Sequence, residues 1–86
     1  MNINQLSEII KIKILNDELI KKLEVEDKSY LHKNHKSREP GKFHIKLKIE
    51  STELQNKDKI YSNRYIYKIL EEEMKFYIHS LQIEFV

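Results

Sequence analysis

The chain has 86 residues, of which 40% are hydrophobic and 35% are charged, so it can bury one modest core and is too apolar for a disordered segment. Its net charge of +2 creates no overall field that would demand nucleic acid or an acidic membrane, so such a partner would need a local patch. The absence of cysteine excludes disulfide bonds, and it excludes a thiolate cage for zinc or an iron–sulfur cluster built by this chain alone.

The length predicts a single domain over residues 1–86. The first residues lack a charged segment followed by an uninterrupted apolar stretch, and no apolar run approaches the length of a membrane span. We therefore expect no export signal, no membrane partner and a cytoplasmic location.

The N-terminal quarter predicts a helix followed by a strand. Apolar residues recur at helical spacing at Leu6, Ile9, Ile10 and Ile14. This pattern favours an amphipathic helix capped by Asn4 and broken at residues 16–17, although residues 9–14 also alternate like a strand. Leu19 and Ile20 are expected to add a short helical turn, and residues 23–26 alternate as a first strand.

Residues 28–42 predict a long loop, because they contain the only proline and the only glycine of the chain and have no periodicity. Residues 43–50 then alternate clearly, which predicts a strand with one core face and one wet face. The core face holds Phe43, Ile45, Leu47 and Ile49, and the wet face holds His44, Lys46, Lys48 and Glu50.

Residues 51–58 are polar and predict a turn, whereas residues 60–74 predict a helical region that Asp58 or Ser62 could cap. Residues 77–85 alternate again, and this alternation places His79 on the core face of a last strand, together with Leu81 and Ile83. The order of elements predicts an α+β fold, in which a small mixed three-stranded sheet has its helices packed on one face.

Residues spread over the chain resemble the BolA family. The resemblance runs from about Leu23 to Gln82, and its most specific part is the pair of motifs Arg64-x-Ile66-Tyr67 and Ile78-His79-x-Leu81 at this separation. It also involves Leu23-Glu24-Val25, Asp27, Ser29, His32, His44, Lys46, Ser51, Leu70 and Glu72-Glu73. The resemblance implies a type II KH-like domain with the order α-β-β-α-α-β.

The resemblance also implies a partner and a cofactor. Proteins of this family bind a monothiol glutaredoxin as a heterodimer and share a [2Fe-2S] cluster with it, in iron–sulfur cluster trafficking or iron-responsive regulation. The partner's cysteine and glutathione would supply the thiolates. We expect no cluster on the isolated chain, which should be a monomer or a weak dimer.

The family positions imply His79 as the C-terminal cluster ligand and His32 as the second ligand, with His44 as the alternative. Imidazole can replace thiolate on one iron of a [2Fe-2S] centre, and it must be neutral to do so. From the residues alone, His79 could instead be a packed histidine at a strand end that bonds to backbone, and His32 a solvated loop residue.

Two other functions remain open. Some family members are described as DNA-binding regulators, and the candidate contacts here are Arg64, Lys33, Lys36, Arg38 and Lys42. The family often has Arg-His-Arg where this chain has Ser62-Asn63-Arg64, which weakens this hypothesis. The chain could also dock proteins through the exposed face of its second strand.

We expect no enzyme activity, because no nucleophile–base pair is visible and Glu71-Glu72-Glu73 is typical of a solvated helix face.

Overall fold

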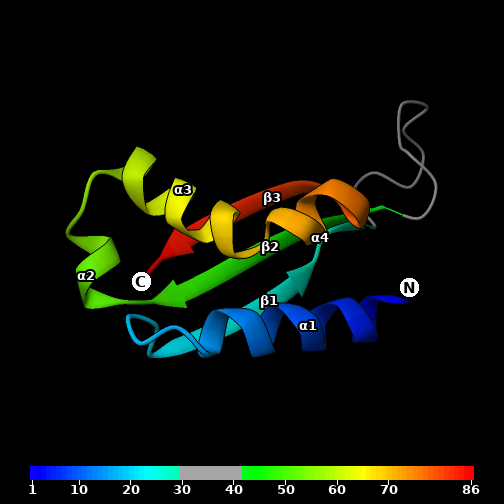
Figure 1. The fold of residues 1–86 in the computed structure, drawn as a ribbon, viewed down its shortest axis with the longest axis horizontal. Helices are drawn as coiled ribbons and strands as arrows, with labels where there is room; N and C mark the ends of the chain where they lie inside the picture. Colours follow the sequence, from blue (N-terminus) through cyan, green and yellow to red (C-terminus); the bar gives the residue numbers. More distant parts are fainter. Residues whose placement is uncertain (30–41) are drawn as a thin grey trace.

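The computed structural model describes residues 1–29 and 42–86, which form a mixed sheet with helices packed against it (Figure 1). The elements are α1 (Ile3–Leu15), β1 (Lys22–Asp27), β2 (Phe43–Glu50), α2 (Thr52–Gln55), α3 (Lys59–Ile69), α4 (Glu71–Phe76) and β3 (Ile78–Phe85). In these ranges three strands pair in the order β1-β2-β3, with β2 antiparallel to β1 and parallel to β3. The predicted α+β fold with a mixed three-stranded sheet is confirmed, and α2 adds one short helix to the predicted order.

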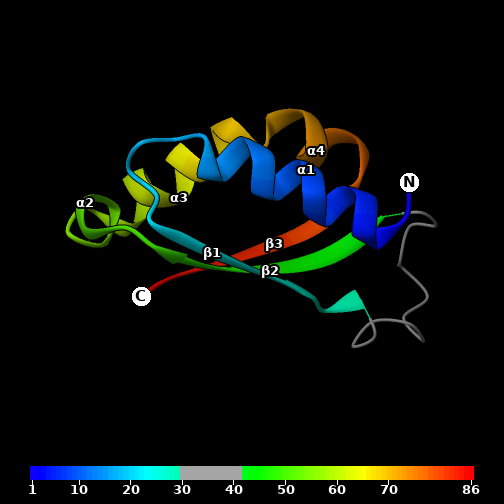
Figure 2. The same ribbon diagram turned by 90° about the horizontal axis from the view of Figure 1, so that it is seen from below.

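The helices α1, α3 and α4 cover the same face of the sheet, while the other face carries no helix (Figure 2). The core between the two layers is apolar, because the helices and the central strand turn their periodic apolar residues toward each other. Its most deeply buried members are Leu6, Ile10, Ile14, Ile45, Leu47, Ile49, Leu54, Ile66, Leu70 and Ile78. Within the described ranges, no helix has the length and apolar character needed to cross a membrane.

The first helix begins earlier than its sequence predicts. Asn2, not Asn4, is the N-cap: its Oδ1 accepts a hydrogen bond from the Gln5 backbone N–H at 2.9 Å, and Gln5 Oε1 accepts one from the Asn2 N–H at 3.0 Å. This reciprocal capping box satisfies two backbone donors, which a cap at Asn4 would not do. The helix ends at Asn16 as predicted, but the helical turn predicted at Leu19 and Ile20 is a non-helical turn.

The connection between β2 and β3 contains more helix than predicted. The predicted turn at residues 51–58 includes α2, whose N-cap Ser51 accepts a hydrogen bond from the Leu54 N–H at 3.2 Å. The helical region at residues 60–74 divides at Leu70, whose ψ of 22° departs from helical values and separates α3 from α4. Of the two predicted caps, Asp58 is the N-cap of α3, whereas Ser62 is buried and donates to the Leu54 carbonyl.

The acidic run after Leu70 is not wholly solvated, so that prediction is wrong for Glu73. Glu73 is only 3% exposed, and its Oε2 lies 2.7 Å from Lys13 Nζ of α1. The restart of the helix at α4 turns Glu73 toward α1, where the Lys13 ammonium balances its charge. This ion pair ties the first helix to the last one.

Candidate functional site

His79 occupies a bulge at the start of β3. Phe43 of β2 lies opposite Ile78 of β3, and the next residue, His44, lies opposite Ser80, so His79 is the extra residue of the bulged strand. Ile78 is 2% exposed, whereas His79 is exposed. The prediction that His79 lies on the core face is therefore wrong, because the bulge shifts the alternation of the strand by one residue.

His44 lies against His79 from the neighbouring strand. The centroids of the two imidazole rings are 4.9 Å apart, and the rings meet edge to face at 63°. His44 Nδ1 is 2.6 Å from Ser80 Oγ, and the His44 backbone N–H donates to Ser29 Oγ at 3.1 Å. His44 belongs to the same alternating set of β2 residues as Lys46, as predicted. It is only 5% exposed, however, so the prediction that its side chain faces solvent is wrong.

The two imidazole rings form a candidate metal-ligand site, but they differ in accessibility, since His79 is exposed and His44 is buried. A neutral imidazole nitrogen is a good ligand for iron or zinc, so His79 fits an iron centre that approaches from outside. Among the residues that the structure describes, no group of three or more histidine, aspartate or glutamate side chains could hold a metal ion. A metal centre at His79 would therefore need ligands from beyond the described residues. The predicted second ligand, His32, lies outside the described residues.

Ser80 is a residue of this site that the sequence did not reveal. Its hydroxyl reaches His44 only because the bulge puts the two residues opposite each other. A hydrogen bond at Nδ1 fixes the orientation of an imidazole ring. No spacing in the sequence could have predicted this contact, because strand register is a tertiary property.

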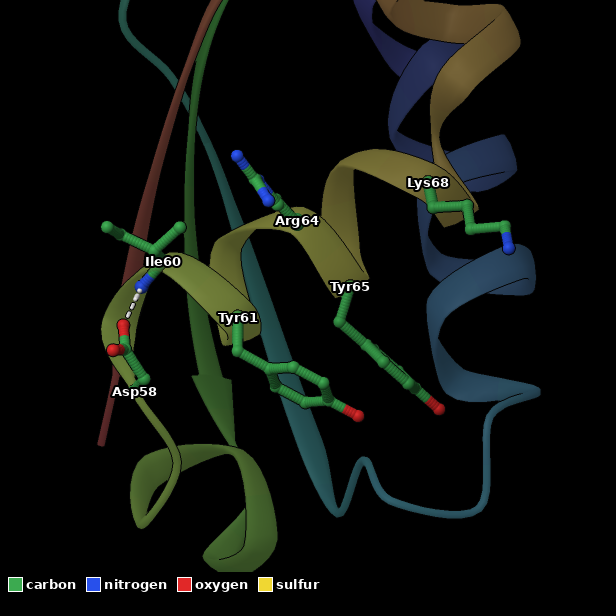
Figure 3. A pocket seen from close by; sticks show the side chains of 6 residues that line it. All are labelled: Asp58, Ile60, Tyr61, Arg64, Tyr65 and Lys68. Atoms are coloured by element: carbon green, nitrogen blue, oxygen red, sulfur yellow. Dashed lines mark hydrogen bonds between the residues drawn. The ribbon is translucent and has the colours of Figure 1, made fainter.

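The predicted nucleic-acid contacts do not form one patch in the described ranges. Arg64 is exposed on α3 (Figure 3), and Lys42 is half-buried just before β2. The helix α3 and the start of β2 lie toward opposite ends of the long axis (Figures 1 and 2). The other predicted contacts, Lys33, Lys36 and Arg38, lie outside the described residues.

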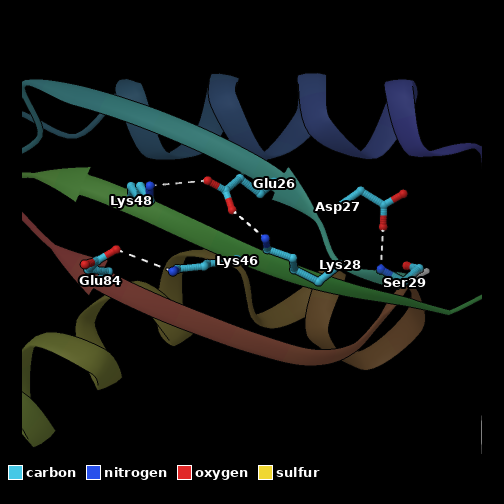
Figure 4. Close-up of polar contacts among 7 residues, drawn as sticks. All are labelled: Glu26, Asp27, Lys28, Ser29, Lys46, Lys48 and Glu84. Carbon is cyan, nitrogen blue, oxygen red and sulfur yellow. Dashed lines mark hydrogen bonds and ion pairs between the residues drawn. The ribbon is translucent and has the colours of Figure 1, made fainter. Parts of the chain in front are cut away.

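The helix-free face of the sheet carries a network of ion pairs (Figure 4). Lys46 Nζ lies 3.6 Å from Glu84 of β3, whereas Lys48 and Lys28 lie 3.5 Å and 3.1 Å from Glu26 of β1. A hydrogen bond from Lys28, together with the charges of Lys28 and Lys48, lowers the pKa of Glu26 below its usual range. The lysines on the outward face of the second strand are thus paired with carboxylates of the neighbouring strands.

The fold and the histidine pair define a small α+β domain in which the described residues place an exposed imidazole at a strand bulge. The sequence model of the family described as BolA-like protein matches residues 15–86, so the chain belongs to this family. The resemblance seen in the sequence is thereby confirmed.

Similar proteins come from Arabidopsis thaliana. The chain is 38% identical over 66 residues to "SufE-like protein 1, chloroplastic/mitochondrial", a match that covers 71% of this chain and only 18% of that protein. The BolA domain of SufE1 superposes with a TM-score of 0.75 at 30% identity, covering 99% of this chain and 92% of that one. BolA1 superposes with a TM-score of 0.67 at 27% identity, covering 99% and 89%.

Proposed function

We propose that this protein binds a monothiol glutaredoxin and that His79 supplies one ligand to a [2Fe-2S] cluster shared by the two proteins. The role would be in iron–sulfur cluster trafficking or iron-responsive regulation. The observation that carries the proposal is the bulge, which turns His79 outward while its neighbour Ile78 stays in the core. An exposed imidazole on a rigid strand can be reached by a partner's iron without unfolding of the sheet.

The remaining ligands would come from the partner's cysteine and from glutathione, because this chain has no cysteine. When bound, the cluster supplies iron that accepts a nitrogen lone pair. The chain's own contribution is to present the His79 imidazole in a fixed orientation at the start of β3.

We assign His44 a positioning role. Its ring is buried, its Nδ1 is engaged with Ser80, and its edge contact with His79 limits the rotation of the exposed ring. His32 stays the predicted second ligand.

The test is to mix the chain with a cluster-loaded monothiol glutaredoxin and glutathione, and to record visible circular dichroism and the size of the complex. Gln82→Ala is the matched control, because Gln82 is exposed on the same strand as His79. We expect the wild-type chain and Gln82→Ala to form a heterodimer with an altered cluster spectrum, and His79→Ala to lose that change. A wild-type spectrum from His79→Ala would refute the ligand assignment, and the absence of any heterodimer with the wild-type chain would refute the function.

We further propose that the chain acts by binding, without catalysis of its own, and that it works in the cytoplasm. The basis for the first point is the make-up of the site, an imidazole pair with the Ser80 hydroxyl hydrogen-bonded to His44, which suits the binding of a metal or a partner. Fractionation of cells that express the tagged chain tests the compartment, and recovery in an organelle would contradict it.

A further inference from the structure

An open groove runs along the outer side of α3, away from the histidine site. It has a volume of about 460 Å³ and is lined by Asp58, Ile60, Tyr61, Arg64, Tyr65 and Lys68. Five of its lining residues follow two rows along α3 with a spacing of four residues: Ile60, Arg64 and Lys68 in one row, and Tyr61 and Tyr65 in the other. The two tyrosines point to the same side of α3, whereas Arg64 points away from them (Figure 3).

The groove exposes apolar surface that the fold does not use. Ile60 is 64% exposed and Tyr61 is 52% exposed, although α3 buries Ile66 and Ser62 completely on its other side. Tyrosine and arginine are enriched at the centres of protein–protein interfaces, where a large ring or a flat guanidinium packs against a partner. The residues on this side of α3 therefore have the character of a contact surface.

One wall of the groove is held in place before any partner arrives. The Tyr65 hydroxyl donates a hydrogen bond to Asp17 Oδ2 at 2.6 Å, which ties α3 to the turn after α1. The ring of Tyr61 lies 6.4 Å from that of Tyr65, and Lys57 Nζ lies 5.7 Å from the Tyr61 ring centroid. Because these side chains are already restrained, a partner would lose less conformational entropy on binding to them.

The charge around the groove selects the kind of partner. Residues 57–68 carry four cations against the single carboxylate of Asp58, which already accepts a hydrogen bond from the Ile60 N–H at 2.7 Å. On the tyrosine side, the Asp17 carboxylate is likewise engaged, by the Tyr65 hydroxyl. Within the part of the chain that the structure describes, Lys57, Lys59, Arg64 and Lys68 form no ion pair, in contrast to the lysines on the outer sheet face. Unneutralised cations beside exposed apolar side chains complement a segment that is both acidic and apolar.

We propose that the α3 groove binds an acidic amphipathic helix of a protein partner, with an apolar side chain between Ile60 and Tyr61 and with carboxylates at Arg64 and Lys68. Rows of side chains at four-residue spacing are ridges, and a second helix packs its own ridge into the groove between two such rows. Nucleic acid would use the cations, but it would leave the exposed Ile60 without an apolar contact. The acidic helix satisfies both features of the surface.

The experiment titrates the nitrogen-15-labelled chain with three probes and follows its backbone amide signals by nuclear magnetic resonance. The probes are a synthetic helical peptide with leucine on one face and glutamate on the flanks, the same peptide with lysine in place of glutamate, and a short DNA duplex. We expect the glutamate peptide alone to shift the signals of α3, with those of His79 and its neighbours unchanged. Arg64→Glu should weaken this binding about fivefold or more, as expected when an attraction becomes a repulsion.

Two variants separate the groove from general charge effects. Lys68→Glu should weaken the glutamate peptide as Arg64→Glu does, whereas Lys11→Glu makes the same charge change at an exposed position on α1 and should leave binding unchanged. Equal weakening by Lys11→Glu, or α3 shifts with DNA in place of the peptide, would overturn the proposal. If neither the glutamate peptide nor the DNA shifts the α3 signals, the proposal is overturned as well. The proposal does not rest on the cluster site, because its readout does not involve iron.

Discussion

Tyr65 shows how one hydrogen bond changes the chemistry of a single residue. Its hydroxyl donates to the Asp17 carboxylate, and this bond, with partial burial and the negative charge of Asp17, raises the pKa of Tyr65 from 10.0 to about 12. The folded state therefore holds this proton more tightly than the unfolded state does. The bond stabilises the fold fully below the unfolded pKa of 10.0, and its contribution is lost as the pH rises toward about 12.

We predict a late tyrosine in the ultraviolet titration of the folded chain. One of the five tyrosines should ionise near pH 12, and Tyr65→Phe should remove that late component. The variant should also lose less stability than the wild type between pH 10.0 and pH 12. Tyr61→Phe, which removes a neighbouring hydroxyl from α3, is the control. A late component that persists in Tyr65→Phe would contradict the assignment.

At the residue scale, the sequence identified His79 as the central residue of the site, but it did not predict that the side chain faces outward. His79 and His44 were both candidates from their residue type and family positions. Their exposures are the reverse of what strict alternation predicts. For His79 the reason is the bulge, which breaks the alternation of β3. His44 keeps the face that alternation gives it, but it is buried among neighbours that include Ser29, Ser80 and the ring of His79. The Ser80 contact depends on the same register, so it too was beyond reach of the sequence.

At the scale of elements, the pair of Lys13 and Glu73 fixes α4 against α1. The Glu73 carboxylate is buried, and its second oxygen, Oε1, has no hydrogen-bond partner among the described residues. A hydrogen bond from the lysine to this carboxylate raises the pKa of Lys13 above its usual value. The helix contact therefore depends on the lysine to offset a buried negative charge.

Lys13→Met should destabilise the chain by about 1–3 kcal/mol, because it leaves a buried carboxylate without its donor. Adding Glu73→Met should recover part of this loss, so that the double variant is more stable than the sum of the single effects predicts. Denaturant unfolding of the four proteins of this cycle measures the coupling. Lys11→Met is the matched control on an exposed turn of α1, and an equal loss of stability in both lysine variants would refute the coupling.

Elements with a clear hydrophobic periodicity could be predicted from the sequence. Short helices that depend on a local cap could not. The strand β2 has the bounds that its alternation predicts, since every second residue from Phe43 to Ile49 is apolar. The four-residue helix α2 offers too few residues for a period, and it forms because Ser51 caps it and Leu54 is buried. The separation of α3 from α4 at Leu70 is a matter of backbone geometry within an unbroken helical pattern.

At the scale of the whole molecule, the two proposed surfaces lie apart. The start of β3, which carries His79, and the first turns of α3, which carry the groove, lie toward opposite ends of the long axis (Figure 1). One face of the sheet is covered by helices, and the other is a network of ion pairs. This arrangement would let the chain hold a cluster with one partner while α3 binds another.

The central claim is that His79 supplies a ligand to a cluster completed by a glutaredoxin, and nitrogen hyperfine spectroscopy tests it most directly. The chain would be produced with nitrogen-15 in its histidines only, combined with an unlabelled cluster-loaded glutaredoxin, and reduced so that the cluster is paramagnetic. We predict strong coupling from a directly bound labelled nitrogen, and the loss of that coupling in His79→Ala but not in Gln82→Ala. A reduced complex without coupling to any labelled nitrogen, or with the same coupling in His79→Ala, would contradict the account.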